Sequence, residues 1–183
     1  HAGVVVIGPG LGKSGWAKRL LACVLEAPQP LVVDADALNL LANEVIRREN
    51  WILTPHPGEA GRLLRQTTAA VQADRFTAVR AIQDRYAGSA VLKGAGSIIS
   101  SDTGPMAVCA AGNPGMATAG MGDVLSGIIG GLLAQGMSLS GAALAGVCLH
   151  ACAGDRAAQG GERGLLARDI ISQLRPLLNS PTL

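Results

Sequence analysis

Aromatic residues are almost absent from this sequence of 183 residues: two Trp, one Tyr and one Phe make up 2% of it. Charged residues are also few, at 15%, and no block of basic residues stands out. Proteins that bind nucleic acid usually combine clustered cations with stacking aromatic side chains. With a formal net charge of only +2, nucleic acid is therefore not expected as a partner.

Cysteine is scarce, and its spacing excludes two further classes of protein. The four cysteines show neither a C-x-x-C pair nor the density of a secreted disulfide scaffold, which predicts reduced thiols in a cytoplasmic protein. His150 lies between Cys148 and Cys152 on an expected helix, but only the two cysteines share a face, so no metal site is predicted. No signal peptide is recognisable, and the first residue is His1 rather than Met, which predicts that the chain lacks its N-terminal part.

Residues 124–154 carry no formal charge and form a stretch long enough to span a bilayer. The turn-like residues 135–140 interrupt this stretch, which also carries Gly127, Gly130, Gly131, Gly141 and Gly146. Two buried helices that pack through small residues explain this pattern better than one membrane span. No membrane association is expected.

Apolar residues make up 49% of the chain, and short β-branched runs alternate with segments of helical period. This alternation is typical of βαβ units, so the sequence predicts one α/β domain over residues 1–183 with a mainly parallel central sheet flanked by helices. In the expected helices, the apolar face of the first consists of Trp16, Leu20 and Leu21. Thr68 caps a long helix whose apolar face consists of Val71, Phe76, Val79 and Ile82. Expected strands cover 3–7, 31–33, 51–53, 90–92 and a hairpin of 97–100 with 106–109; expected helices cover 15–27, 36–42, a start at Pro57, 68–87, 123–135, 139–159 and 167–178.

The first glycine-rich loop, residues 8–15, admits several interpretations. Gly10 to Gly15 match G-x-G-x-x-G after a strand, and Asp34 ends the next strand, as in a Rossmann dinucleotide site. A tight turn without a ligand explains the same residues. A P-loop is excluded, because the glycine that it requires would fall at Ile7.

The second loop, residues 112–123, leads into an apolar helix. Its glycines allow backbone N–H groups to converge on an anion, and the start of a helix also favours negative charge. Asp123 is then unusual, because it places a carboxylate where the site attracts anions. It is interpreted either as the N-cap of the helix or as a general base beside a phosphoryl group, and the second interpretation is preferred.

These loops carry a family resemblance. Gly120-Met121-Gly122-Asp123 resembles the G-x-G-D anion-hole motif of ribokinase-like proteins, and residues 112–131 resemble the signature of the ADP-dependent NAD(P)H-hydrate dehydratase family. Four further motifs match in order, namely residues 6–12, 33–39, 53–59 and 91–97. Ser97, where threonine is usual, is a mild departure, as is Ala119. Members of the family usually extend well upstream of the first motif, and in some bacteria the domain follows an epimerase domain for the same damaged cofactor.

The resemblance implies a three-layer ribokinase-like fold and a reaction that restores hydrated NADH or NADPH. A phosphoryl group from ADP, or from ATP in eukaryotic members, is placed on the C6 hydroxyl, and phosphate is then eliminated; Mg²⁺ bridges the nucleotide phosphates. Asp123 would be the catalytic base, and Gly120, Met121 and Gly122 the anion hole. The substrate would lie against Gly10, Gly12, His56 and Asp123, and the nucleotide against Lys93, Gly94, Ala95, Gly96, Ser97 and Gly122. A homo-oligomer is expected, and a tetramer is one candidate for its size.

Each of these assignments has a plainer alternative. His56 suits a surface loop, Glu59 the first turn of a helix, and residues 93–97 a hairpin turn. Asp36 is expected to cap a helix, and Asn39 to line the site. For the whole chain, a ribokinase-like kinase of a small molecule and a nucleotide-binding module without activity remain as alternatives.

Overall fold

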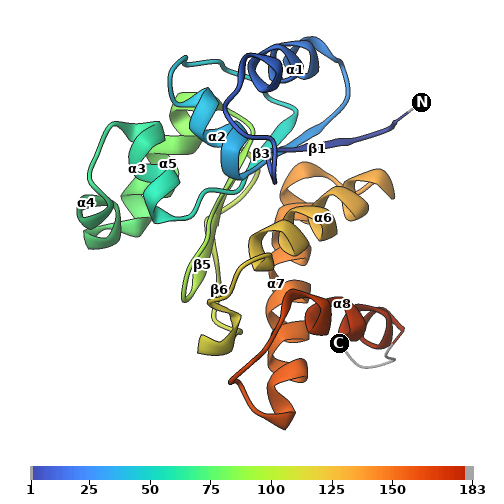
Figure 1. Ribbon diagram of the computed structural model, residues 1–183. Helices are drawn as coiled ribbons and strands as arrows, with labels where there is room; N and C mark the ends of the chain where they lie inside the picture. Colours follow the sequence, from blue (N-terminus) through green and yellow to red (C-terminus); the bar gives the residue numbers. More distant parts are fainter. Residues whose placement is uncertain (1, 180–183) are drawn as a thin grey trace.

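The computed structural model describes residues 2–179 and contains a six-stranded sheet with helices on both faces (Figure 1). The strands follow one another in space as in the sequence; the first four run parallel, the fifth runs antiparallel to the fourth, and the sixth runs antiparallel to the fifth. The predicted mainly parallel sheet is therefore confirmed. The strands are β1 (Val5–Ile7), β2 (Leu31–Val33), β3 (Trp51–Leu53), β4 (Ser89–Leu92), β5 (Ser97–Ser100) and β6 (Ala107–Cys109).

The central strands are buried on both faces. Successive side chains of a strand point to opposite sides, so Leu31 and Val33 join the core on one face of the sheet while Val32 joins the core on the other. Ile52 of β3 and Val91 of β4 lie on the same side as Val32. This arrangement explains why these strands are continuous apolar runs rather than alternating ones.

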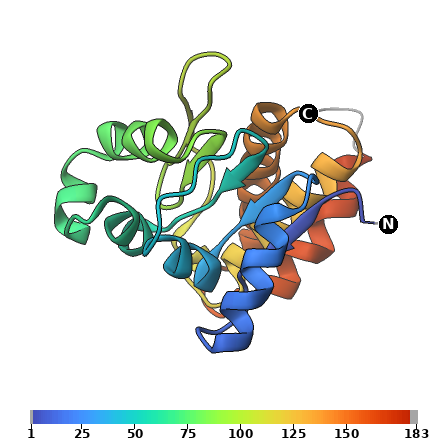
Figure 2. The same ribbon diagram turned by 90° about the horizontal axis from the view of Figure 1, so that it is seen from above.

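Helices α1 to α5 cover one face of the sheet, and α6 and α7 cover the other, with α8 packed on α6 and α7 (Figures 1 and 2). The result is three layers, as predicted. The helices are α1 (Gly15–Glu26), α2 (Ala35–Leu41), α3 (Pro57–Leu64), α4 (Thr68–Ala73), α5 (Arg75–Tyr86), α6 (Met121–Ala134), α7 (Leu139–Ala157) and α8 (Ala167–Leu178), with short 3₁₀ turns η1 (Pro114–Met116) and η2 (Ala158–Gly160).

The single helix predicted over residues 68–87 is wrong: it consists of α4 and α5, which meet at Asp74. The N-cap of α4 is Thr67, not Thr68, because the Thr67 side chain accepts from the Ala70 N–H at 3.1 Å. The Asp74 side chain likewise caps α5 by accepting from the Thr77 N–H at 3.0 Å. Asp competes for backbone N–H groups and so favours a helix start over a helix interior.

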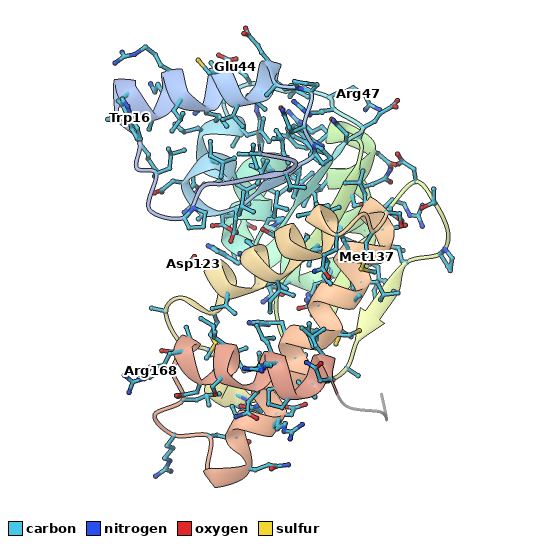
Figure 3. All side chains as sticks on the ribbon, turned by 90° about the vertical axis from the view of Figure 1, so that its right-hand side faces the viewer. Trp16, Glu44, Arg47, Asp123, Met137 and Arg168 are labelled. Atoms are coloured by element: carbon cyan, nitrogen blue, oxygen red, sulfur yellow. The ribbon has the colours of Figure 1, made fainter. Side chains whose placement is uncertain are left out.

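The predicted apolar faces of two helices were also partly wrong. Trp16 and Leu20 are exposed on α1, and Trp16 lies on its outer surface (Figure 3). Leu21 is buried as predicted, together with Ala17, which comes one position after Trp16. One residue turns a helix by about 100°, so this small shift moves Trp16 out of the core. Phe76 is 50% exposed on α5 for the same kind of reason.

The uncharged residues 124–154 form the two packed helices that the sequence predicts. A Cβ atom added at Gly146 of α7 would lie 2.6 Å from the Ile129 side chain of α6, so glycine allows the close approach. Among residues 2–179, no helix is both long and apolar enough to cross a membrane. The predicted hairpin is confirmed as β5 and β6.

Candidate functional site

Asp34 and Lys93 join two of the sequence motifs in one ion pair at the carboxyl ends of the parallel strands. Asp34 follows β2 and is 1% exposed, and Lys93 follows β4. Lys93 Nζ lies 2.6 Å from Asp34 Oδ1, and the Ser126 hydroxyl of α6 donates to Asp34 Oδ2 at 2.7 Å. Ligands of open α/β sheets bind at this edge. The pair therefore marks the centre of the candidate site.

The position of Asp34 argues against the Rossmann interpretation. A Rossmann carboxylate must face the ribose of a bound dinucleotide, but both carboxylate oxygens of Asp34 are buried and engaged. Asp34 is also the N-cap of α2, because its side chain accepts from the Ala35 N–H at 2.9 Å. The predicted cap, Asp36, is therefore wrong. Ala35 has a φ of +46°, a strained conformation of a kind that clusters at functional sites.

The loop after β1 lies directly against this turn. Gly8 has a φ of +132°, and a Cβ atom there would lie 1.7 Å from the Asp34 carbonyl oxygen, so only glycine fits. The Gly12 N–H donates to Asp36 Oδ2 at 2.9 Å. Gly10 and Gly12 also have positive φ, and no atom lies within 4 Å of the position of an added Cβ, so there is open space beside the backbone at both residues. The two predicted substrate-binding glycines are thus accessible at the sheet edge.

His56 is the N-cap of α3, and its side chain is partly exposed to solvent. Its Nδ1 accepts from the Gly58 N–H at 3.0 Å, and Glu59 Oε2 accepts from the His56 N–H at 2.8 Å, which forms a reciprocal cap. The His56 side chain is 51% exposed, whereas that of Glu59 is 6% exposed and lies 3.9 Å from Lys93 Nζ. Glu59 therefore connects the start of α3 to the Asp34–Lys93 pair. Asn39, expected to line the site, accepts from Arg62 at 2.9 Å.

Residues 93–97 connect the antiparallel strands β4 and β5, so they form a hairpin turn, as the plainer interpretation had it. The turn is not a minimal one. The Ser97 hydroxyl donates to the Gly94 carbonyl at 3.1 Å, and Gly94 and Gly96 adopt φ of +148° and +66°. These features hold the backbone in an open loop beside Lys93. The structure brings together Lys93 and the loop glycines predicted to bind nucleotide.

Asp123 lies in the first turn of α6, and its side chain is exposed to solvent at the N-terminal end of this helix (Figure 3). The N-cap is Gly120, with φ of +84° and no side chain, so the interpretation of Asp123 as the cap is wrong. A Cβ atom added at Gly122 would lie 3.1 Å from Lys93 Nζ. The start of α6 therefore meets the buried ion pair, and a helix N-terminus and a cation converge beside an accessible carboxylate.

Two polar residues near this loop gave no usable signal in the sequence. Asp155 of α7 accepts from the Gly112 N–H and from the Asn113 amide, both at 2.9 Å, and so fixes the start of the second glycine-rich loop. His150, also of α7, is half-buried behind the start of α6. Burial lowers its pKa to about 4, against the opposing effect of the Met121 carbonyl. Neither contact follows from sequence spacing, because the helices that supply them are distant in the chain.

The family model described as NAD(P)H-hydrate dehydratase matches residues 1–176. The chain belongs to the NAD(P)H-hydrate dehydratase family. A solved dehydratase of this family from Bacillus subtilis, ADP/ATP-dependent and co-crystallised with ATP and Mg²⁺ before soaking with CoA, has a TM-score of 0.84 at 27% identity; the match covers 96% of this chain and 65% of that one. A ribokinase-like superfamily protein from Enterococcus faecalis has a TM-score of 0.84 at 30% identity, covering 96% and 63%. The predicted family and the predicted ribokinase-like fold are both confirmed.

Two members of the dehydratase family show how much of a relative the chain spans. The bifunctional NAD(P)H-hydrate repair enzyme of Coxiella burnetii is 62% identical over 179 residues, which cover 97% of this chain and 37% of that enzyme. The ADP-dependent (S)-NAD(P)H-hydrate dehydratase of Neisseria meningitidis is 46% identical over 187 residues, covering 97% and 63%. The chain thus spans about a third of the first relative and under two thirds of the second.

Proposed function

We propose that this chain dehydrates hydrated NADH or NADPH, using ADP or ATP as the phosphoryl donor. The observation that carries the proposal is the start of α6, where the exposed Asp123 carboxylate directly follows Gly122, the residue of this helix that lies against Lys93. A carboxylate among groups that attract anions suits a general base beside a transferring phosphoryl group. The name of the Neisseria relative, an ADP-dependent dehydratase at 46% identity, supports the same activity.

The reaction has two steps in this proposal. Asp123 accepts the proton of the C6 hydroxyl as the hydroxyl oxygen attacks the terminal phosphoryl group of the nucleotide, and the shortened nucleotide leaves. The backbone N–H groups of Gly120, Met121 and Gly122 stabilise the charge on the transferred group. Phosphate then leaves C6 while the neighbouring ring carbon loses a proton, which restores the double bond.

The two ligands have separate places along the sheet edge. Gly10 and Gly12 follow β1, whereas the loop of residues 93–97 follows β4, three strands away in the sheet. At about 4.8 Å per strand this separation is roughly 14 Å, which leaves room for two ligands side by side. We place the hydrated nicotinamide between Gly10, Gly12 and His56, and the adenine nucleotide against Lys93 to Ser97 and Gly122, with Asp123 between them.

Mg²⁺ fits this arrangement as an ion held mainly by the nucleotide phosphates and water. In the part of the chain that the structure describes, no group of three His, Cys, Asp or Glu side chains is arranged to hold a metal. The buried carboxylates Asp34 and Glu59 both face Lys93 instead. Bound Mg²⁺ would neutralise part of the phosphate charge. The Bacillus neighbour, co-crystallised with ATP and Mg²⁺, supports this assignment.

Analysis of the reaction products tests this proposal against a ribokinase-like kinase. The chain is incubated with hydrated NADH, Mg²⁺ and either ADP or ATP, and absorbance of the reduced nicotinamide is followed. A dehydratase restores the absorbance and releases inorganic phosphate. A stable phosphorylated alcohol without restored absorbance would contradict the proposal and support a kinase. Binding of ADP without any turnover would support a nucleotide-binding module.

The same relatives support a proposal about the protein in which this domain lies. We propose that the whole protein also carries an epimerase for the same damaged cofactor, since the Coxiella relative is a bifunctional hydrate repair enzyme. A cytoplasmic location suits a repair enzyme of NADH and NADPH. The homo-oligomer and the single domain over residues 1–183 stay predictions.

A further inference from the structure

Arg75, the first residue of α5, donates to two carbonyl groups of the loop that follows β4. Its Nη1 lies 2.6 Å from the Ala95 carbonyl oxygen, and its Nη2 lies 3.3 Å from the Leu92 carbonyl oxygen. A Cβ atom on Gly94 would lie 3.0 Å from Nη2, so the loop passes directly over the guanidinium group. One planar side chain therefore contacts the residue just before the loop of residues 93–97 and the second and third residues of that loop.

These contacts fix the direction in which the loop presents its N–H groups. In a trans peptide the C=O and the next N–H point to opposite sides. The Leu92 carbonyl faces Arg75, and the Lys93 N–H on the other side donates to Pro55 at 2.9 Å. In the same way, holding the Ala95 carbonyl toward Arg75 turns the Gly96 N–H away from Arg75. Gly94 and Gly96 would otherwise allow many backbone conformations.

We infer that Arg75 is a positioning residue for the nucleotide phosphates: it holds residues 93–97 so that the Gly96 N–H and the Lys93 ammonium face the bound nucleotide. The inference rests on the proposed function, because that proposal places the nucleotide at this loop. It adds a residue that contacts neither ligand. Arg75 acts only through the orientation of the loop, so its loss affects the affinity for nucleotide rather than the chemical step.

Arginine suits this role better than lysine. The two carbonyl groups belong to residues three apart, and a rigid planar fork reaches both at once, whereas an ammonium group is a single point of contact. Arg75 is half-buried, and this partial burial lowers the pKa of its guanidinium group. Asp74 caps α5 and so sets the position from which Arg75 extends.

The test compares Arg75→Gln and Arg75→Lys with Arg80→Gln, an exposed arginine on the same helix that undergoes the same change of charge. Calorimetric titration of ADP gives Kd, and steady-state kinetics give kcat and both KM values. We expect Arg75→Gln to raise the Kd and KM of ADP about 10-fold or more, the effect of losing a charged hydrogen-bond donor. Arg75→Lys gives a smaller rise, and Arg80→Gln gives none. The kcat and the KM of hydrated NADH stay within about 2-fold, as expected for pure positioning.

Several outcomes would overturn the inference. An unchanged Kd for ADP in Arg75→Gln, or equal rises in the KM of both ligands, would show that the loop does not depend on Arg75 in the proposed way. If Arg75→Gln fails to fold by circular dichroism, Arg75→Lys alone decides, and an ADP affinity equal to that of the wild type contradicts the inference. A wild-type chain that binds ADP without dehydrating the substrate would refute the proposed function only. A chain that binds neither ADP nor ATP would refute both.

Discussion

Replacing Asp34 by asparagine tests whether the ion pair with Lys93 organises the site. The substitution keeps the size of the side chain and an oxygen for the Ser126 hydroxyl, but it removes the negative charge that lies 2.6 Å from Lys93 Nζ. The Lys93 side chain is only 17% exposed, so water does not replace the lost partner. The remaining carboxylate, Glu59, lies 3.9 Å from Nζ and compensates in part.

The size of the effect follows from the burial of the pair. Removing one partner of a buried ion pair costs about 3–5 kcal/mol, because the other charge stays buried without compensation. We expect Asp34→Asn to lie at the lower end, about 3 kcal/mol, since Glu59 remains. For a domain of this size that loss lowers Tm by roughly 6–12 °C. The double variant Asp34→Asn with Lys93→Met should lose less than the sum of the two single variants.

Urea unfolding followed by circular dichroism measures the free energy of unfolding for these variants. Asp84→Asn is the matched control, because Asp84 is exposed on α5, and its change should stay within about 0.5 kcal/mol. A loss below about 1 kcal/mol in Asp34→Asn, or strictly additive single variants, would refute the reasoning. In that case Asp34 and Lys93 would not depend on each other in the folded chain.

Three further predictions concern other residues of the site. Gly122→Val should weaken ADP binding at least 10-fold in calorimetry, because its side chain would displace Lys93 Nζ, which lies 3.1 Å from the position of an added Cβ. The control is Gly131→Val in the same helix, where no atom lies within 4 Å of an added Cβ, and this variant should bind ADP normally. Equal effects of the two variants on ADP binding would contradict this prediction. His56→Ala should raise the KM of hydrated NADH more than that of ADP and cost about 1 kcal/mol of stability through the lost cap; no difference between the two KM values would remove His56 from the substrate site. His150 has its pKa lowered by burial from 6.5 to about 4, so the neutral folded form contributes stability above about pH 6.5 that is lost as pH falls toward 4, on the order of 3 kcal/mol. Urea unfolding at several pH values should show this slope in the wild type and not in His150→Gln.

The sequence predicted most of the fold because the local signals were strong. Continuous apolar runs such as Leu31–Val33 mark buried strands, and the glycines before Asp123 mark a loop between β6 and α6. Predictions failed where one residue decides between neighbouring structures. The sequence around Asp74 is compatible with a continuous helix, and only the structure shows that the Asp74 side chain caps α5. Trp16 lies one position away from the buried stripe of α1.

The candidate site was predicted as a set of motifs, but not as a network. The motifs at residues 6–12, 33–39, 53–59 and 91–97 each end one of the parallel strands, so their common edge could be expected from a parallel sheet. The partners within it could not, since Lys93 pairs with a residue 59 positions away and Ser126 with one 92 positions away. Arg75 was missed for a related reason: nothing in its local sequence shows that its guanidinium reaches the loop after β4.

Turnover of hydrated NADH by Asp123→Asn tests the central assignment most directly. Asparagine keeps the size of the side chain at the start of α6 but cannot accept the hydroxyl proton. We expect turnover with ADP and Mg²⁺ to fall on the order of 10²–10⁴-fold, the usual range for a lost general base. The Kd of ADP in calorimetry should stay within a few-fold of the wild-type value. Turnover close to that of the wild type would contradict the assignment of Asp123 as the catalytic base.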